Sequence, residues 1–213
     1  MMTRPRIVSI EGNIGAGKTT LVNRLKELYK NSQEVIFAEE PVDIWGTITQ
    51  DGKNILELFY ENQEKYSFAF QILAYTTRRQ LLKNLIQQYT NTSVKTIVME
   101  RSLEADKNIF AKLLHQTHKI EDSMYKVYEL MSEDGLKEFG ADGIIWLDTS
   151  PEQCIERIAN RNRDGEDKIS LAYLNDIDVC HREWLSADTG FVHRLSTNDS
   201  FDEEKLDVYL IHR

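Results

Sequence analysis

Residues 12–19 read Gly-Asn-Ile-Gly-Ala-Gly-Lys-Thr, a complete GxxxxGK[ST] motif directly behind the apolar run Ile7 to Ile10. Glycines allow backbone conformations with positive φ, so successive N–H groups of such a loop can point at one anion. The helix expected next adds free N–H groups and its dipole. An ordinary glycine-rich turn is the alternative, but a full match between strand and helix favours nucleotide binding. The residues expected to bind triphosphate are Gly12, Asn13, Ile14, Gly15, Ala16, Gly17, Lys18, Thr19 and Thr20.

Acidic and basic side chains follow the predicted strands. Glu40 precedes Pro41, and proline blocks helical continuation, so residues 40–45 are expected in an extended path. Such a carboxylate is a candidate general base toward an alcohol that accepts a phosphoryl group; a solvated strand-end acid is the alternative. Glu100 and Arg101 also end a strand, where Glu100 could share Mg²⁺ with Thr19 and Arg101 could neutralise charge on the transferring phosphoryl group. A structural ion pair is the alternative there.

An arginine cluster follows the helix start at residues 149–152. Arg157 and Arg161 share a helix face, and Arg163 lies in a polar segment that contains Gly165. Three guanidinium groups could fold over a triphosphate, so residues 157–169 are predicted to form a phosphate-binding lid. A solvated basic face is the alternative. Lys18, Glu40, Arg101 and Arg161 are the predicted catalytic residues.

Gln71 and Arg78 are seven residues apart on a long predicted helix and therefore share one side of it. Helical apolar spacing usually indicates core, and Phe68 is interpreted that way. A carboxamide on an apolar face differs, because its donor and acceptor can read the edge of a nucleobase.

The elements that must position these groups form an alternating pattern. Five β-type runs are predicted at 6–11, 35–39, 96–100, 143–148 and 191–197, with helices at 18–29, 55–61, 64–89, 103–115, 122–139, 151–160, 171–187 and 202–211. Alternation of this kind predicts an α/β fold with a parallel sheet covered on both faces. In an open α/β sheet the ligand lies beyond the carboxyl ends of the strands. The phosphate loop, Glu40, Glu100 and Arg101 are therefore expected on one rim.

Composition narrows the class of protein. The chain has 213 residues, 41% of them hydrophobic, and no linker-like segment, so a single domain over 1–213 is expected. No signal peptide or membrane-length apolar run is recognisable, which predicts a cytoplasmic location without membrane association. The net charge of −9 argues against a nucleic-acid polymer as partner. Cys154 and Cys180 are interpreted as reduced and structural. His115 and His118 are interpreted as a solvated helix surface, since no further zinc ligand is near.

Together these motifs resemble the deoxynucleoside kinase family, which includes deoxycytidine and deoxyguanosine kinases, mitochondrial thymidine kinase and an insect multisubstrate enzyme. The resemblance covers nearly the whole chain. Its specific elements are IEGNIGAGKTT at 10–20, EPVDIW at 40–45, FQ at 70–71, ERS at 100–102 and RxxxRxR at 157–163. It implies a three-layer P-loop NTPase-type fold, ATP as phosphoryl donor, Mg²⁺ as cofactor and a deoxynucleoside as acceptor. It also implies a homodimer formed through residues 103–115 and 122–139. Leu113, Leu114, Val127 and Leu130 could supply the apolar surface for it, and burial within one subunit is the alternative for the same residues.

The resemblance also implies individual roles. Glu40 is similar to the base on the 5′-hydroxyl, Gln71 to the reader of the nucleobase, and Arg101 to the contact of the 5′-oxygen. The aromatic walls would be Trp45, Phe70 and Phe110, and the pair on the 3′-hydroxyl would be Tyr60 and Glu166. Asp199 and Phe201 resemble residues of the loop on the donor's base. Ala74, Arg78 and Asp106 are similar to the trio of deoxycytidine and purine-type members, which implies deoxycytidine or a purine deoxynucleoside over thymidine.

Two alternative functions remain at this point. A thymidylate-kinase-like monophosphate kinase shares the loop, sheet and arginine lid, but it needs a basic residue for the acceptor's phosphate, and Glu40 with Gln71 fits a neutral nucleoside better. A GTPase needs an NKxD signature, which the sequence lacks; residues 43–46 match DxxG, a pattern short enough to recur by chance.

Overall fold

The computed structural model describes the chain except for residues 1–3, 162–165, 187–191, 197–205, 208 and 211–213. Its centre is a five-stranded sheet in the order β2-β5-β1-β6-β7, and every neighbouring pair of strands is parallel. The strands are β1 (Arg6–Gly12), β2 (Val35–Ala38), β5 (Thr96–Glu100), β6 (Gly143–Asp148) and β7 (Val192–Ser196). The predicted α/β fold with a parallel sheet is confirmed.

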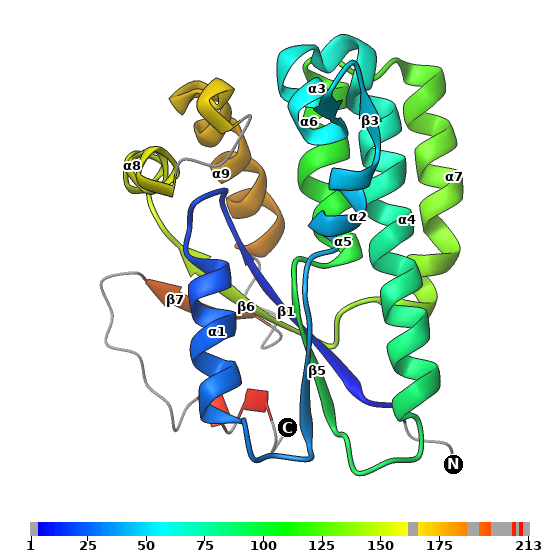
Figure 1. The fold of residues 1–213 in the computed structure, drawn as a ribbon, viewed down its shortest axis with the longest axis vertical. Coiled ribbons are helices and arrows are strands. Elements are labelled where there is room, and N and C mark those ends of the chain that lie inside the picture. The colour runs from blue at the N-terminus through cyan, green and yellow to red at the C-terminus, as the bar shows by residue number, and fades with distance from the viewer. Residues whose placement is uncertain (1–3, 162–165, 187–191, 197–205, 208, 211–213) are drawn as a thin grey trace.

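Helices cover both faces of this sheet (Figure 1). The long helices α4 (Gln63–Tyr89) and α7 (Asp122–Phe139) stand on one side, with α1 (Lys18–Leu28) on the other. Near the carboxyl ends of the strands lie α8 (Pro151–Arg161), a short 3₁₀ turn (Glu166–Lys168) and α9 (Leu171–Leu185). No helix in the described residues is long and apolar enough to span a membrane.

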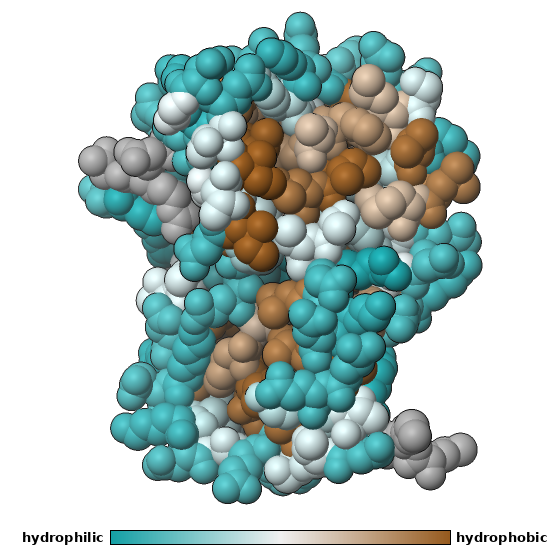
Figure 2. Space-filling view, turned by 45° about the vertical axis from the view of Figure 1, so that its right-hand side comes forward, coloured by the Kyte–Doolittle hydropathy of each residue, from teal (hydrophilic) through white to brown (hydrophobic). Residues whose placement is uncertain are grey.

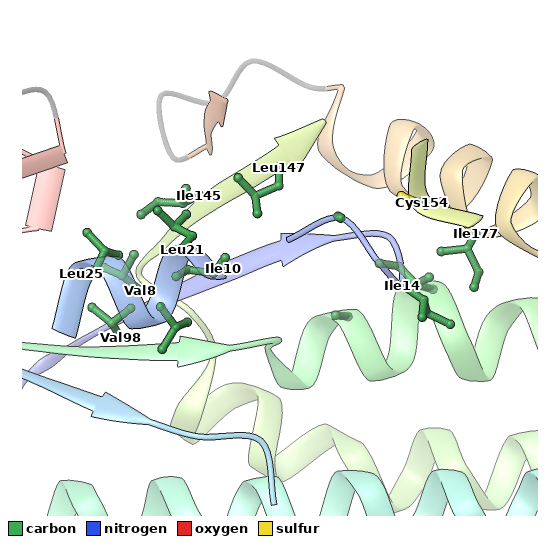
Figure 3. Close-up of a cluster of buried hydrophobic side chains, with 14 of the residues drawn as sticks. Val8, Ile10, Ile14, Leu21, Leu25, Val98, Ile145, Leu147, Cys154 and Ile177 are labelled. Carbon is green, nitrogen blue, oxygen red and sulfur yellow. The ribbon is translucent and has the colours of Figure 1, made fainter. Parts of the chain in front are cut away.

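The largest core cluster packs α1 against the sheet. Figure 3 shows Val8 and Ile10 of β1 beside Leu21 and Leu25 of α1, while Ile14 of the phosphate loop lies close to Ile177 of α9. Apolar residues on both faces of a strand must each find a packing partner, and they do so here because helices lie on both sides. The same contacts fix the phosphate loop between α1 and α9.

Three local elements differ from the sequence expectation. Residues 40–45 are not extended: α2 (Val42–Thr47) begins immediately after Pro41, whose φ is −78°. Proline's fixed φ suits a helix start, so the same residue that blocks continuation from upstream begins a new helix. A hairpin of β3 (Thr49–Gln50) and β4 (Lys53–Asn54) then leads into α3 (Ile55–Glu61), which Asn54 caps.

The predicted helix 103–115 is also divided. It consists of α5 (Leu103–Ala105), a π-helical segment (Asp106–Ala111) and α6 (Lys112–Gln116). A π segment adds a residue to the helical turn and rotates the side chains that follow. Toward the carboxyl terminus, residues 206–207 and 209–210 are helical, and the remainder of the predicted helix 202–211 lies outside the described residues.

Candidate active site

A cavity of about 290 Å³ opens at the carboxyl ends of β1, β2 and β5. It is continuous from the phosphate loop to a pocket among α2, α3, α4 and the π segment. The predicted site residues that line it are Ile14, Gly15, Lys18, Thr19, Glu40, Trp45, Tyr60, Phe70, Gln71, Ala74, Arg78, Glu100, Arg101, Asp106, Phe110, Arg161 and Glu166. Residues from widely separated parts of the chain therefore meet in one space.

The phosphate loop depends on glycine at two positions. Gly15 has φ of 78°, and a Cβ there would lie 2.6 Å from the carbonyl oxygen of Cys154 in α8. Gly17, with φ of 101°, occupies the N-cap of α1 and has no side chain to bond the first turn. The N–H groups at the start of α1 are thus open to an anion, as phosphate binding requires.

Lys18 lies inside this loop with 5% exposure, and its Nζ donates to the carbonyl oxygens of Asn13 at 2.8 Å and Gly12 at 3.3 Å. Burial, with the nearby charge of Arg101, lowers the pKa of Lys18 to about 8. An added polyphosphate would favour the charged ammonium form, because an opposite charge stabilises it.

Two oxygen ligands of the type that Mg²⁺ prefers lie together beside Lys18. The Thr19 hydroxyl donates to the Glu100 carboxylate, with a distance of 3.0 Å to Oε2. Hydroxyl and carboxylate oxygens, completed by phosphate and water, fit the coordination of Mg²⁺. These two residues are therefore suited to hold the ion.

Glu40 is joined to a buried ion-pair network. Its Oε1 accepts from Nη2 of Arg78 at 2.8 Å and lies 3.8 Å from Nε of Arg101. Arg78 also forms an ion pair with Asp106, and both side chains are under 5% exposed. Arg78 therefore pairs with both carboxylates, and its bond to Glu40 was not expected from the sequence. A buried cation between two carboxylates is compensated in charge, which a single buried charge would not be.

Aromatic rings enclose the other end of the cavity. The centroids of Trp45 and Phe70 lie 5.3 Å apart in an edge contact, and Phe59 stacks on Phe70 at 4.9 Å. Gln71 lies at the cavity wall with 2% exposure, and its Oε1 has no hydrogen-bond partner among the described residues. A buried acceptor without a partner is costly, so it indicates a ligand that donates to it.

The lid arginines contact protein groups. Arg161 forms a bidentate pair with Glu166, at 2.6 Å from Nη2 to Oε1 and 3.0 Å from Nε to Oε2, and Glu166 is 4% exposed. Arg157 donates to the carbonyl oxygen of Ala16 in the phosphate loop at 2.9 Å. Tyr60 lines the cavity with Glu166, and burial raises the pKa of its hydroxyl group, which therefore stays protonated.

The other predicted site residues that the structure describes do not line the cavity. Gly12, Asn13, Ala16, Gly17 and Thr20 belong to the loop and the first turn of α1. Arg163, Asp199 and Phe201 lie outside the described residues.

Two aromatic residues of the cavity wall were missed from the sequence. Phe59 is one position before Tyr60 on α3, and Tyr173 stands near the start of α9. Neither belongs to a motif, and an aromatic residue in a helix usually indicates core. Their only signal was position: Phe59 adjoins a predicted site residue, and Tyr173 follows the predicted lid.

Comparisons with known proteins agree with this geometry. The family profile described as deoxynucleoside kinase matches residues 8–210. The chain is 35% identical to human deoxycytidine kinase, over 95% of this chain and 82% of that protein. It is 35% identical to a probable deoxycytidine kinase of Fowlpox virus (strain NVSL), over 84% and 71% of the two chains. A mitochondrial deoxyguanosine kinase of Xenopus laevis is 30% identical, over 85% and 74%.

Proposed function

The chain belongs to the deoxynucleoside kinase family, and we propose that it phosphorylates deoxycytidine or a purine deoxynucleoside in preference to thymidine. Members of this family transfer a phosphoryl group from ATP to a nucleoside. The observation that carries the preference is the buried Arg78–Asp106 pair, which lines the same cavity as the unpartnered carboxamide oxygen of Gln71. This pair occupies space beside a bound base and leaves little for the methyl group of thymine.

In this proposal the two ends of the cavity bind different substrates. The apolar end takes the nucleobase between Trp45, Phe70 and Phe110, with Gln71 pairing to its edge. Tyr60 and Glu166 bind the 3′-hydroxyl, which places the 5′-hydroxyl toward Glu40 and Arg101. The phosphate loop, Lys18 and the lid arginines bind ATP, and the chain acts as a single kinase domain. The support for these roles is that the residues assigned to the nucleoside line one cavity together with Lys18 of the phosphate loop and Arg161 of the lid.

We assign proton removal from the 5′-hydroxyl to Glu40. Arg78 at 2.8 Å keeps its carboxylate oriented, and Arg101 stands beside it, where negative charge develops as the phosphoryl group transfers. Mg²⁺ held by Thr19 and Glu100 would neutralise charge on the phosphate oxygens when bound. The site also has to hold the two substrates in the orientation for transfer, and side chains fixed by packing are well suited to this.

A substrate panel tests the proposal. Wild-type protein with ATP and Mg²⁺ is given deoxycytidine, deoxyadenosine, deoxyguanosine, thymidine and their 5′-monophosphates, and kcat/KM is measured for each by separation of the products. We expect a deoxycytidine or purine maximum, thymidine lower by about 10- to 200-fold, and no transfer to monophosphates. Thymidine as best substrate would contradict the preference. Preferred transfer to a monophosphate would instead support the thymidylate-kinase-like alternative.

A cytoplasmic location is also proposed. Its support within the described residues is that Cys154 and Cys180 are both buried free thiols, as is usual in a reducing compartment.

We further propose a homodimer, with a corrected surface. Leu113 and Leu114 are 5% and 1% exposed and pack inside their own chain, so they cannot supply it. On α7, Val127 and Leu130 are 54% and 65% exposed. Figure 2 turns the α7 side of the molecule forward and shows apolar surface gathered over the upper half of that view. An apolar surface of this kind favours association with a second copy.

Sedimentation velocity at micromolar concentration checks the dimer. We expect the wild type to sediment as a dimer and Leu130→Glu as a monomer, because the charge would be buried at the interface. Val179→Glu is the matched control: Val179 is 53% exposed on α9, away from α7, and its variant should remain dimeric. A wild type that is only monomeric would rule the dimer out.

A further inference from the structure

Glu11, near the end of β1, is a buried carboxylate that none of the roles above uses. It is 0% exposed. Its Oε1 accepts hydrogen bonds from the Ser9 hydroxyl and from the backbone N–H of Ser102, the latter at 2.8 Å. Its Oε2 has no partner among the described residues. A buried carboxylate with an unpaired oxygen is unfavourable by itself, so the group that it bonds indicates its purpose.

The backbone N–H of Ser102, which Glu11 accepts, belongs to a strained turn. Arg101 has φ of 63°, in the left-handed region that a residue with a Cβ rarely adopts and that persists only where neighbours hold it. The N–H of Arg101 donates to the carbonyl oxygen of Ile10 at 3.1 Å, and the next N–H, from Ser102, donates to Glu11. Both acceptors lie on β1, so two successive N–H groups attach the turn to the strand that leads into the phosphate loop.

The turn sets the direction of the Arg101 side chain, which follows directly on the last residue of β5. The Arg101 guanidinium lies over the ring of Phe110 at 4.6 Å and donates to the carbonyl oxygen of Gly12 at 3.3 Å. The Glu100 carboxylate, just before the turn, accepts from the Thr19 hydroxyl. A change of φ at Arg101 would alter the path of its side chain. The Arg101 side chain would then leave the rim of the cavity although it was not itself changed, whereas Glu100 stays paired with Ile10 in the sheet.

We propose that Glu11 is a positioning residue for phosphoryl transfer. Its Oε1 holds the Ser102 N–H and thereby keeps the left-handed turn that directs Arg101 into the cavity. The inference rests on the proposed function, because it assigns Glu11 to the same reaction. The competing role is electrostatic, since the negative charge of Glu11 also acts on Lys18 and Arg78.

Two substitutions separate reach from charge. Glu11→Gln has the length of glutamate and keeps an oxygen acceptor without the charge. Glu11→Asp keeps the charge but is shorter by one methylene group and cannot span to Ser102. We expect Glu11→Asp to lower kcat by about 10- to 100-fold and Glu11→Gln to remain within a few-fold of wild type. A normal kcat in Glu11→Asp, or a Glu11→Gln variant impaired at least as much, would overturn the proposal.

Glu104 provides the matched control. It is also a largely buried acid: its Oε1 accepts the backbone N–H of Ala141 at 2.8 Å and its Oε2 has no partner among the described residues, and it lies beside the hydroxyl of Ser102 but does not bond the Ser102 N–H. That N–H precedes β6 and does not belong to the turn. Glu104→Asp should therefore lower the melting temperature without lowering kcat. Losses of kcat that follow the melting temperature alike in both aspartate variants would show a merely structural role for Glu11 and overturn the proposal.

Amide hydrogen exchange at Ser102, followed by NMR, gives a readout independent of turnover. Exchange should accelerate in Glu11→Asp and stay near the wild-type rate in Glu11→Gln. If the wild-type protein phosphorylated no nucleoside while the two variants showed this exchange pattern, the proposed function would be contradicted, and the hold of Glu11 on the turn would not. Unchanged exchange at Ser102 in Glu11→Asp would overturn the inference itself.

Discussion

Glu40→Gln is expected to lower kcat by about 10²- to 10⁴-fold while nucleoside affinity stays nearly unchanged. Glutamine keeps the shape of the side chain and an oxygen that can accept from Nη2 of Arg78, which the Glu40 carboxylate accepts at 2.8 Å. It cannot take a proton from the 5′-hydroxyl. Arg78 keeps Asp106 as its buried counter-charge, so the variant should fold.

The measurement pairs turnover with binding. kcat comes from product formation under saturating ATP, and the dissociation constant of the nucleoside comes from calorimetry without ATP. Asp43→Asn is the control, because Asp43 is an exposed acid on α2 that does not line the cavity. Near-normal turnover in Glu40→Gln with unchanged affinity would show that another group, or the substrate itself, takes up the proton.

Much of the fold could be predicted because the buried strands of a parallel sheet have a recognisable sequence pattern. Residues 96–100 and 143–148 are strands with the predicted bounds, since apolar runs of that length between turn residues indicate strands covered on both faces. Parallel strands place their carboxyl ends on one edge, so strand-end residues such as Glu40 and Arg101 could be expected together before any contact was known. Their meeting in one cavity follows that expectation.

The differences lie where local sequence and tertiary packing compete. Pro41 is compatible with a break and with a helix start, and the helix that forms buries Trp45, which is 5% exposed. The π segment at Asp106–Ala111 has no distinct sequence pattern, because its apolar spacing is close to that of an α-helix. It matters for the site, since it carries Asp106 and Phe110, both of which line the cavity.

The site residues that belong to sequence motifs could be predicted, whereas the contacts that depend on tertiary packing could not. Gln71 and Arg78 were found from their shared helix face. The bond from Arg78 to Glu40 could not be predicted, because it joins α4 to the segment after β2, and these come together only in the folded structure. The roles of these side chains in catalysis and binding stay predictions that the substitutions above and below address.

The double substitution Arg78→Met with Asp106→Ala is expected to raise the ratio of kcat/KM for thymidine to that for deoxycytidine by about 10- to 200-fold. Removing the pair opens the space beside the nucleobase, and Ala74, at 4% exposure on the same helix, adds no bulk there. The absolute kcat should fall with every substrate, because Glu40 loses its bond from Arg78.

The two changes should be strongly non-additive, which distinguishes a pair from two independent contacts. Each single variant leaves one buried charge without its main partner, at side-chain exposures of 2% for Arg78 and 4% for Asp106. Removing one member of a buried ion pair is far more costly than replacing both, so the singles should be less stable than the double. Arg79→Met, one position along α4 and outside the cavity, controls for loss of an arginine from this helix. If the double variant kept the wild-type thymidine to deoxycytidine ratio while the singles added independently, the pair would not set the preference, and the choice of base would have to lie with Gln71 and the aromatic walls.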